Sequence, residues 1–434
     1  MIRMYLALIL AWLPVHVALA QTLEIDPIRG SAAALPIAVA PFDYLGVQAA
    51  PDTDVAAVVR ADLDRSGSFR TLPERDLVER PVREPDVNFG TWRLLKQDYL
   101  LIGRLLDDPE GGYRAEFELF DVAKQQRMLG LAVKGRAGNM RDVAHQIADQ
   151  VYEKILGVRG AFWTRIAYVT AIGRGNNMVY SLMIADADGY NPQTVVRSRE
   201  PLLSPAWSHD GRRLAYVSFE RGASSIYIQE IASGAREVIA SFKGINGAPS
   251  FSPDDTKLTL ALSRTGNPEI YVMDLASRHL TQVTQHWSID TEPVFTADGR
   301  NLIFTSDRGG KPQLYQVSVA GGDAQRITFN GQYNATASLA PDGRIAMAQG
   351  EGNVYRIAVL DRRYGNQGEV RLISPGNLDE SPSFAPNGSM ILYAARENQR
   401  GVLYAVSADA RVRQRLVLAD GDVREPAWSP FRSR

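Results

Sequence analysis

Oxygen-bearing side chains recur in the second half of the chain, in short segments that lead into a repeated motif. These segments read SREPLLSP, FKGINGAP, WSIDTEP, FNGQYNAT, GNLDESP and GDVREP, and their carboxylates and amides include Asn246, Asp290, Glu292, Asn334, Asp379, Glu380 and Glu425. Such groups can hydrogen-bond a partner or ligate a hard cation such as Ca²⁺. They can also cap the starts of strands as ordinary turn residues. Because each segment precedes the same motif, the repeated units would bring these side chains together on one face of the molecule. We therefore interpret them as a binding surface on a rigid scaffold.

Residues that would support catalysis lack the necessary spacing. The histidines beyond residue 20 are His145, His209, His279 and His286, and none forms an HxxxH or HExxH pair. No GxSxG nucleophile elbow, Walker motif or dinucleotide glycine motif occurs. The chain has no cysteine, which excludes disulfides, thiolate metal sites and cysteine nucleophiles. We therefore expect that the protein is not an enzyme and has no catalytic residue. We also expect no metal site, because no calcium-binding loop of recognisable spacing occurs.

A repeat of about 44 residues positions these segments. A proline stands two residues before an aromatic side chain in five copies, and a sixth copy has Ala337 and Leu339 in the same places. The five pairs are Pro205/Trp207, Pro249/Phe251, Pro293/Phe295, Pro382/Phe384 and Pro426/Trp428. Periods near 44 are typical of four-stranded propeller blades.

Each repeat contains several strand patterns. In one unit, Lys257–Ser263, Glu269–Leu275 and His279–Thr284 alternate or are apolar as strands do. Asp298-Gly299 predicts a tight hairpin turn with positive φ at both residues. The repeated aromatic residues are expected to pack between blades.

The count of strands predicts a closed ring. Arg165–Thr170 reads as a second strand with no Pro-aromatic strand before it, whereas the segment REPAWSP near the end of the chain has no second strand after it. We expect the late segment to complete the first blade, because closure removes the open edges. The fold class is thus an α/β N-terminal domain (36–160) followed by an all-β six-bladed β-propeller (161–434).

The first domain has a different pattern. Leu35–Phe42 reads as a buried strand, Asp54–Arg65 as an amphipathic helix, and DYLLIGRLL and YRAEFELFDV as strands. Asn139 is expected to cap a helix that ends at Gly157. The short joint GVRGAFWT suggests that the two domains pack together.

Residues 1–20 have the pattern of a signal peptide, with Arg3, an apolar stretch and a cleavage site after Ala20. We expect export to the periplasm, no membrane span in the mature chain, and a flexible arm at residues 21–35. The net charge of −1 does not suggest nucleic-acid binding.

Several of these features resemble the TolB family of the Tol–Pal system of Gram-negative bacteria. The resemblance rests on the export signal, PIAVAPF, the segment Val143–Thr170, the PxWSPDG-like repeats and the closure at Trp428. The repeats also occur in peptidase propellers, whereas the joint and the closure are more discriminating. The resemblance implies a non-enzymatic periplasmic scaffold that binds the lipoprotein Pal and the inner-membrane protein TolA. It also implies a role in outer-membrane integrity and in constriction during cell division, with outer-membrane proteins as possible further partners.

The resemblance also implies two sets of contact residues. Pal is expected at the propeller loops, through Asn246, Ala248, Thr291, Glu292, Asp379 and Glu380. TolA is expected at the arm, through Leu23, Glu24, Ile25 and Asp26, which would pair as a strand. The arm could instead be disordered, or fold back onto its own domain or the propeller.

Two alternatives to this function remain open from the residues. One is a propeller that binds a carbohydrate or a small ligand in its channel, with Ca²⁺ among the carboxylates as a related prediction. The other is a peptidase-related propeller, which would need a hydrolase domain in addition.

Overall fold

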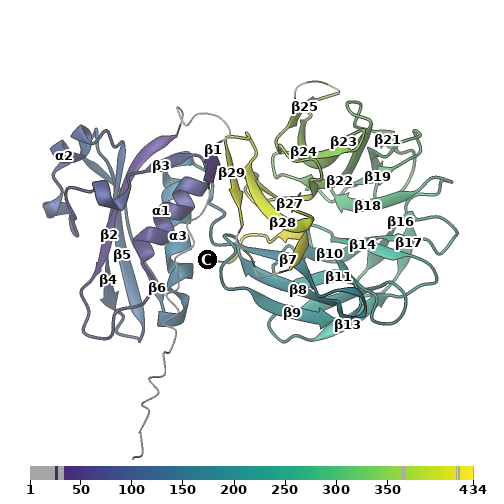
Figure 1. Cartoon of the computed structure of the whole chain (residues 1–434), viewed down its shortest axis with the longest axis horizontal. Helices are drawn as coiled ribbons and strands as arrows, with labels where there is room; N and C mark the ends of the chain where they lie inside the picture. Colours follow the sequence, from purple (N-terminus) through teal and green to yellow (C-terminus); the bar gives the residue numbers. More distant parts are fainter. Residues whose placement is uncertain are drawn as a thin grey trace, which may run out of the picture.

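The computed structural model describes residues 25–27, 34–363, 365, 367–416, 418 and 421–433. It consists of an α/β domain beside a ring of six β-sheets (Figure 1). The predicted signal peptide, its cleavage site, and Leu23 and Glu24 of the arm lie outside the described residues. Within the described residues, no helix is long and apolar enough to cross a membrane.

The α/β domain is built on a five-stranded sheet of order β3-β2-β4-β5-β6. β2 runs parallel to β3 and β4, whereas β4, β5 and β6 are antiparallel neighbours. α1 and α3 share one apolar core with the sheet, and α2 contributes to a smaller core that contains Trp92. The strands are β2 (Leu35–Tyr44), β3 (Phe69–Thr71), β4 (Tyr99–Asp107), β5 (Tyr113–Asp121) and β6 (Gln126–Gly135). The helices are α1 (Val55–Arg65), α2 (Phe89–Leu94) and α3 (Met140–Leu156), with 3₁₀ turns at Glu74–Asp76, Glu84–Asp86 and Ala137–Asn139.

The helix ends agree with the sequence in two of three cases. The Asp54 side chain accepts a hydrogen bond from the Ala57 N–H at 2.9 Å and so caps α1. Gly157 follows α3 with φ 73°, as a C-terminal glycine should. Asn139 occupies the N-cap position of α3, but its side chain accepts from the Arg136 N–H instead. The expected side-chain cap was therefore wrong, because this amide holds the preceding 3₁₀ turn.

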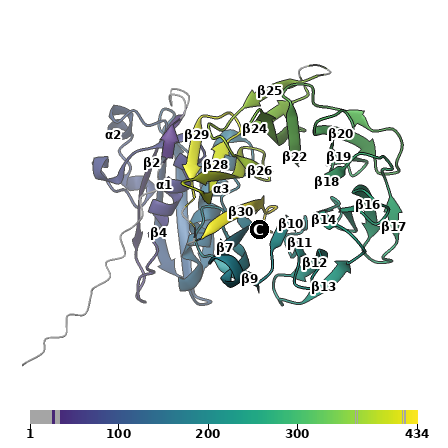
Figure 2. The ribbon, with the colours of Figure 1, turned by 45° about the vertical axis from the view of Figure 1, so that its right-hand side comes forward.

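The propeller has six blades of four strands each, arranged around a central axis (Figure 2). Blade 1 contains β30 (Asp422–Trp428), β7 (Arg165–Ile172), β8 (Val179–Asp186) and β9 (Gln193–Ser198), with a 3₁₀ turn at Gly175–Asn177. Blade 2 contains β10 (Leu202–Trp207), β11 (Arg213–Ser218), β12 (Ser225–Glu230) and β13 (Arg236–Ala240). Blade 3 contains β14 (Asn246–Phe251), β15 (Lys257–Leu262), β16 (Glu269–Asp274) and β17 (Leu280–Gln282).

The remaining blades repeat this order. Blade 4 contains β18 (Asp290–Phe295), β19 (Asn301–Ser306), β20 (Gln313–Ser318) and β21 (Gln325–Arg326). Blade 5 contains β22 (Tyr333–Leu339), β23 (Ile345–Glu351), β24 (Val354–Asp361) and β25 (Glu369–Leu372). Blade 6 contains β26 (Glu380–Phe384), β27 (Met390–Glu397), β28 (Arg400–Ser407) and β29 (Val412–Arg415).

Ring closure is confirmed. β30 pairs antiparallel with β7, and Trp428 lies opposite Ile166. The expected packing of the repeated aromatics is also confirmed, because each belongs to a core shared by two blades. Phe251 of blade 3, for example, packs with Val217 and Ile228 of blade 2.

The hairpin turn at Asp298-Gly299 contains one left-handed residue, where two were expected. Gly299 has φ 68°, but Asp298 does not have a positive φ. Gly299 N–H donates to Thr296 O at 2.8 Å, and the Thr296 hydroxyl donates to the Asp298 carboxylate at 2.6 Å. The expectation of positive φ at both positions was wrong, because a side-chain bond between Thr296 and Asp298 helps to shape the turn and leaves only the glycine left-handed.

The two domains meet at blades 6 and 1. The Asn387 amide of blade 6 donates to Arg159 O at 3.0 Å, and Arg432 pairs with Asp142 of α3 at 2.7 Å. β1 (Ile25–Pro27) lies beside β29 as a fifth strand of blade 6 (Figure 1). The joint at Arg159 and the C-terminal segment at Arg432 therefore both lie where the two domains touch.

Candidate partner-binding surface

Each inner strand of the propeller contains a bulge at the same position. The pairing register shifts between the first and second halves of β10, β14, β18, β22, β26 and β30. One non-glycine residue in each bulge has φ between 47° and 56°: Ser204, Ala248, Glu292, Thr336, Ser381 and Glu425. Left-handed backbone of this kind costs roughly 1–3 kcal/mol per residue and persists only where its surroundings enforce it. The sixfold recurrence shows that the ring as a whole enforces this geometry.

Proline explains part of the pattern. In five of the six bulges a proline follows the left-handed residue, and the sixth has Ala337. Proline has no N–H to donate to a ladder, so it is tolerated where a bulge interrupts the pairing. The Pro-aromatic motif therefore combines a backbone bulge beside the channel with an aromatic side chain that packs between blades.

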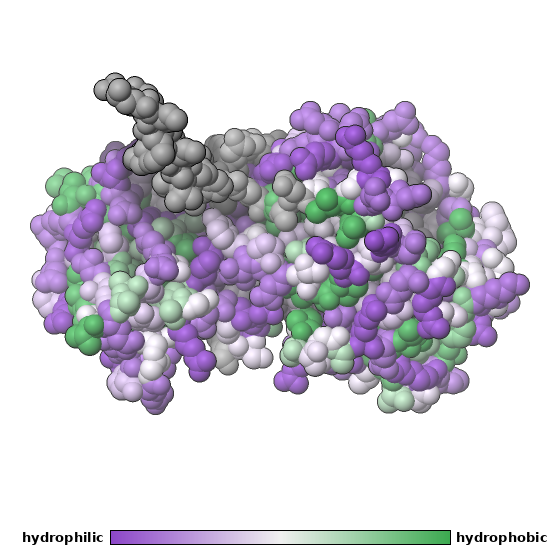
Figure 3. Space-filling model, turned by 60° about the horizontal axis from the view of Figure 1, so that its bottom comes forward, coloured by the Kyte–Doolittle hydropathy of each residue, from purple (hydrophilic) through white to green (hydrophobic). Residues whose placement is uncertain are grey.

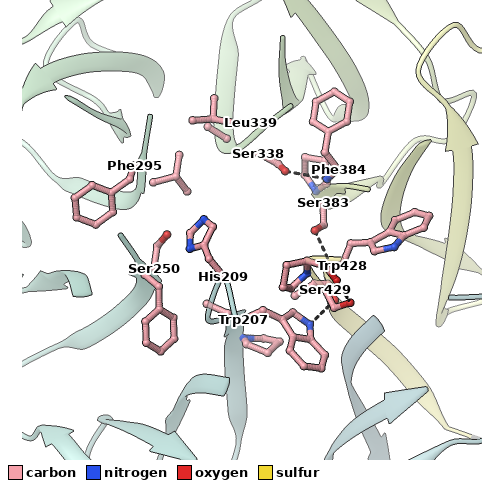
Figure 4. Close-up of a pocket in the computed structure, with 18 of the residues that line it drawn as sticks. Trp207, His209, Ser250, Phe295, Ser338, Leu339, Ser383, Phe384, Trp428 and Ser429 are labelled. Carbon is pink, nitrogen blue, oxygen red and sulfur yellow. Dashed lines mark hydrogen bonds between the residues drawn. The ribbon is translucent and has the colours of Figure 1, made fainter. Parts of the chain in front are cut away.

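The six inner strands line a channel with a cavity of about 600 Å³. Serine hydroxyls join neighbouring strands across it, as Figure 4 shows: Phe384 N–H donates to Ser338 Oγ at 2.9 Å and Trp428 N–H to Ser383 Oγ at 2.8 Å. His209 also lines the channel, where most other blades carry a proline. A cavity of this size falls within the range of small-ligand pockets. The alternative of a channel ligand therefore stays a prediction.

Two carboxylates bridge neighbouring blades at the bulges. Glu425 Oε2 accepts the Ser204 N–H at 2.7 Å, and Glu292 Oε2 accepts the Thr336 N–H at 2.9 Å and the Thr305 hydroxyl at 2.8 Å. Burial raises the pKa of the Glu425 carboxyl, and the negative charges of Glu380 and Glu292 raise it further. These three carboxylates therefore form an acidic mouth to the channel.

Loops lead into the six inner strands, and together we call them the rim. They comprise residues 199–201, 241–245, 285–289, 329–332, 375–379 and 421. Among the predicted contact residues, Ala248, Thr291 and Glu292 are partly exposed just inside the rim and Glu380 is exposed. The structure thus brings four of the six predicted residues to the region of the acidic mouth, while their contact with a partner stays a prediction.

Asn246 and Asp379 require correction as contact residues. Asn246 is 0 % exposed, and its amide bonds to Phe242 N, Phe242 O and Ser224 O. Asp379 is 1 % exposed and accepts from the Ser374 hydroxyl at 2.5 Å and the Gly376 N–H at 3.0 Å, and burial raises its pKa. Both side chains are buried in hydrogen bonds to the loops between blades, and Asn246 also bonds to Ser224 of blade 2, so in this structure they shape the rim loops and are not exposed to a partner.

Exposed apolar side chains on the rim were missed from the sequence. Trp287 is 79 % exposed, and Ile245, Ile289, Phe329 and Leu378 are each about half exposed. Figure 3 shows one face of the molecule, on which hydrophobic residues interrupt a mainly hydrophilic surface. The available signal was a large apolar residue inside each of several polar loops. Exposed apolar groups gathered in one region mark interaction surfaces.

The arm takes one of the alternatives left open by the sequence. Ile25 and Asp26 lie opposite Gln414 and Arg413 in the antiparallel pairing of β1 with β29. The described part of the arm, Ile25–Pro27, therefore lies against the propeller in this structure. Its expected contact with TolA stays a prediction.

The predicted calcium site in the channel stays a prediction. Among the described residues, the one cluster of three acidic or histidine ligands close enough to share an ion is Asp62, His145 and Asp188, at the domain joint. The mouth carboxylates supply the oxygen donors that Ca²⁺ takes, but Glu425 and Glu292 are already bonded to backbone N–H groups.

An α/β domain joined to a closed six-bladed propeller with an acidic, partly apolar rim defines a two-domain propeller protein with a candidate protein-binding face. The family models agree with both halves: the TolB amino-terminal domain matches residues 23–128 and the TolB beta propeller domain matches residues 152–432. The chain belongs to the TolB family.

Relatives match over nearly the whole chain. The Tol-Pal system protein TolB of Xanthomonas oryzae pv. oryzae (strain PXO99A) is 70% identical over 434 residues, which cover 100% of this chain and 99% of the relative. The Xanthomonas euvesicatoria pv. vesicatoria protein of the same name is 72% identical over 414 residues, covering 95% and 94%. The crystal structure of TolB from Acinetobacter baumannii is similar with a TM-score of 0.85 and 40% identity, covering 94% of this chain and 100% of that one. The chain is thus similar throughout to components of the Tol–Pal system.

Proposed function

We propose that this chain is a non-enzymatic periplasmic scaffold of the Tol–Pal system that binds Pal at the propeller rim and TolA through its N-terminal arm. Membership of the TolB family supports the system, and the rim is the observation that carries the Pal site. By binding both partners, the chain would link the envelope layers, support outer-membrane integrity and assist constriction during cell division.

The rim has the chemistry of a protein-binding surface. Trp287 is a large aromatic side chain with most of its surface in solvent, and such residues dominate binding energy when they enter a pocket. Glu292 and Glu380 add negative charge near Glu425 at the acidic mouth, which suits a partner surface with basic or N–H donor groups. All three residues stand on a closed ring of blades, so little backbone freedom is lost on binding.

The arm has the chemistry of an added strand. β1 pairs with β29 at the edge of blade 6. An arm of this kind can exchange one sheet edge for another, because main-chain hydrogen bonds supply the affinity in both cases. We infer that TolA binds the arm when it is released from β29, and that Pal at the rim and TolA at the arm influence one another in this way.

The remaining parts of the proposal follow from the sequence. Residues 1–20 would direct export, with cleavage after Ala20 and a mature protein in the periplasm. Outer-membrane proteins are possible additional partners. We propose that no cofactor is needed, and isothermal titration with CaCl₂ tests whether the acidic mouth takes Ca²⁺.

The rim proposal is tested by titrating soluble Pal into the mature chain and into Trp287→Ala. Truncation of a central aromatic contact should weaken binding at least tenfold, equivalent to about 1.4 kcal/mol or more. Leu94→Ala is the matched control, because Leu94 is an exposed apolar residue of the other domain (86 % exposed). Equal Pal affinity of all three proteins would place the Pal site elsewhere.

A further inference from the structure

A histidine stands between two carboxylates at the joint of the two domains. His145 lies on α3, Asp62 on α1, and Asp188 in the turn between β8 and β9 of blade 1. His145 Nδ1 is 2.7 Å from Asp62 Oδ2, and Nε2 is 3.8 Å from Asp188 Oδ2. All three side chains are buried, with the imidazole 1 % exposed. Asp62, His145 and Asp188 therefore form a row of three side chains that begins in the α/β domain and ends in the propeller.

The imidazole has one satisfied nitrogen and one that is not. Among the described residues, Nε2 has no hydrogen-bond partner. With a proton on Nδ1, His145 donates to Asp62 and turns the Nε2 lone pair towards the Asp188 carboxylate, which is unfavourable. A second proton on Nε2 changes this contact from repulsion to attraction across the joint. The contact between the domains thus depends on the charge of His145.

Other charged groups surround the row on every side. Arg65 pairs with Asp62 at 3.0 Å, and Arg141 pairs with Asp188 and lies 3.7 Å over the Tyr190 ring. The charged groups around His145 include Asp62 and Arg65 on α1, Arg141, Asp142 and Asp149 on α3, Arg159 in the joint, Arg165, Asp186 and Asp188 in blade 1, and Arg432 near the C-terminus.

A metal ion does not fit this cluster well, although the donors are close enough together. The guanidinium groups of Arg65 and Arg141 already occupy the carboxylates of Asp62 and Asp188. A divalent cation would have to displace them and would be repelled by both. A proton on His145 needs no such rearrangement.

We propose that protonation of His145 closes a latch between the α/β domain and blade 1, so that the docking of the two domains depends on pH. Closure adds the His145–Asp188 attraction to contacts that do not involve the imidazole. Among these are the Arg432–Asp142 pair at 2.7 Å and the Arg141–Asp188 pair. Release of the latch should therefore loosen the joint without separating the domains.

The direction of the pH dependence follows from the charges. Burial alone would lower the pKa of His145, but the attraction of Asp62 and Asp188 outweighs it and raises the pKa above the usual 6.5. The latch is thus fully closed below pH 6.5 and opens as the pH rises through the raised value. Asp149 acts in a different range, because burial raises its pKa to about 6 from 3.8.

Distance measurements between the domains test the latch directly. The chain has no cysteine, so spin labels can be placed at Ala123→Cys and Ala232→Cys alone, both of which are exposed. From pH 6 to pH 9, the interdomain distance distribution should broaden, with a midpoint equal to the His145 pKa measured by NMR. A distribution that does not change over this range would overturn the proposal.

Variants separate the latch from other titrating groups. His145→Gln should abolish the broadening, whereas His279→Gln, an exposed histidine elsewhere on the propeller, should retain it. If His145→Gln does not fold, Asp188→Asn provides the second test: it removes the carboxylate that attracts the protonated imidazole, so it should lower the His145 pKa and abolish the broadening. Retention of the full pH response in His145→Gln or in Asp188→Asn would overturn the latch. So would a response to EDTA in the wild-type protein, which would assign the joint to a bound cation.

Discussion

Glu425 of blade 1 accepts a hydrogen bond from the Ser204 N–H of blade 2 at 2.7 Å, and both residues have left-handed backbone. The bond joins the bulge of the last strand in the chain to the bulge of an early one. Two strained segments are thus held by one carboxylate at the place where the ring closes.

Replacement of Glu425 should alter stability in a pH-dependent manner. Burial raises the pKa of this carboxyl above 4.5, so ionisation costs stability as the pH rises. Glu425→Gln keeps an oxygen acceptor for Ser204 without the charge and should unfold at a higher temperature than the wild type at pH 8, with the difference shrinking below pH 4.5. Glu425→Ala leaves the N–H unpaired and should lose about 1–2 kcal/mol at either pH. Thermal melts at the two pH values measure both effects, and a Glu425→Gln difference that does not depend on pH contradicts the assignment.

Deletion of the chain from Glu425 onward should prevent a stable propeller. β7 would lose its pairing with Ala427 and Trp428 in the second half of β30, and the apolar core shared by blades 1 and 6 would lose Trp428. Calorimetry should show loss of the cooperative propeller transition. An unchanged midpoint and width in the truncated protein would mean that β30 is not required for closure.

Charge reversal at Glu292 should weaken Pal binding. Because Glu292 also bonds Thr305 and Thr336, Glu292→Lys should cost about 1–2 kcal/mol of stability in addition. Glu292→Gln keeps the acceptor and isolates the charge, so we expect it to reduce Pal affinity less than Glu292→Lys, with little change in melting temperature. Titration calorimetry on folded variants gives the comparison. Wild-type affinity in both would remove Glu292 from the site.

Removal of residues 21–28 should abolish TolA binding while Pal binding survives. The rim as defined consists of propeller loops, whereas the described part of the arm, Ile25–Pro27, pairs with β29. Parallel pull-downs with soluble TolA and soluble Pal test both halves of the prediction. Full TolA affinity in the deletion would exclude the arm as its binding site.

The sequence was most informative where one pattern repeats. The spacing of Pro-aromatic pairs predicted the blades and the pairing of β30 with β7, because a ring constrains the number and order of its strands. It was least informative about side-chain direction. Asn246 and Glu292 both precede a proline closely, yet one is enclosed by its own loop and the other reaches the channel mouth. The bulge directs the Glu292 side chain towards the channel mouth, and the residue types alone do not predict a glutamate with positive φ.

The joint between the domains was also beyond the sequence. The expected helix between Asn139 and Gly157 contains His145, but Asp62 and Asp188 come from two other parts of the chain. Their meeting depends on how the domains pack, which no local period encodes. β6 was missed for a related reason: most of its residues are exposed, so its alternation is weak.

The pairing of β30 with β7 has a consequence for how the protein is made. β7 is among the first propeller strands to leave the ribosome and β30 is the last, so blade 1 keeps an open edge throughout synthesis of the other blades. A chain that stops early leaves that edge exposed and offers it to degradation. The ring can therefore close only after the strands of all six blades are present, so the integrity of blade 1 depends on the far end of the propeller sequence.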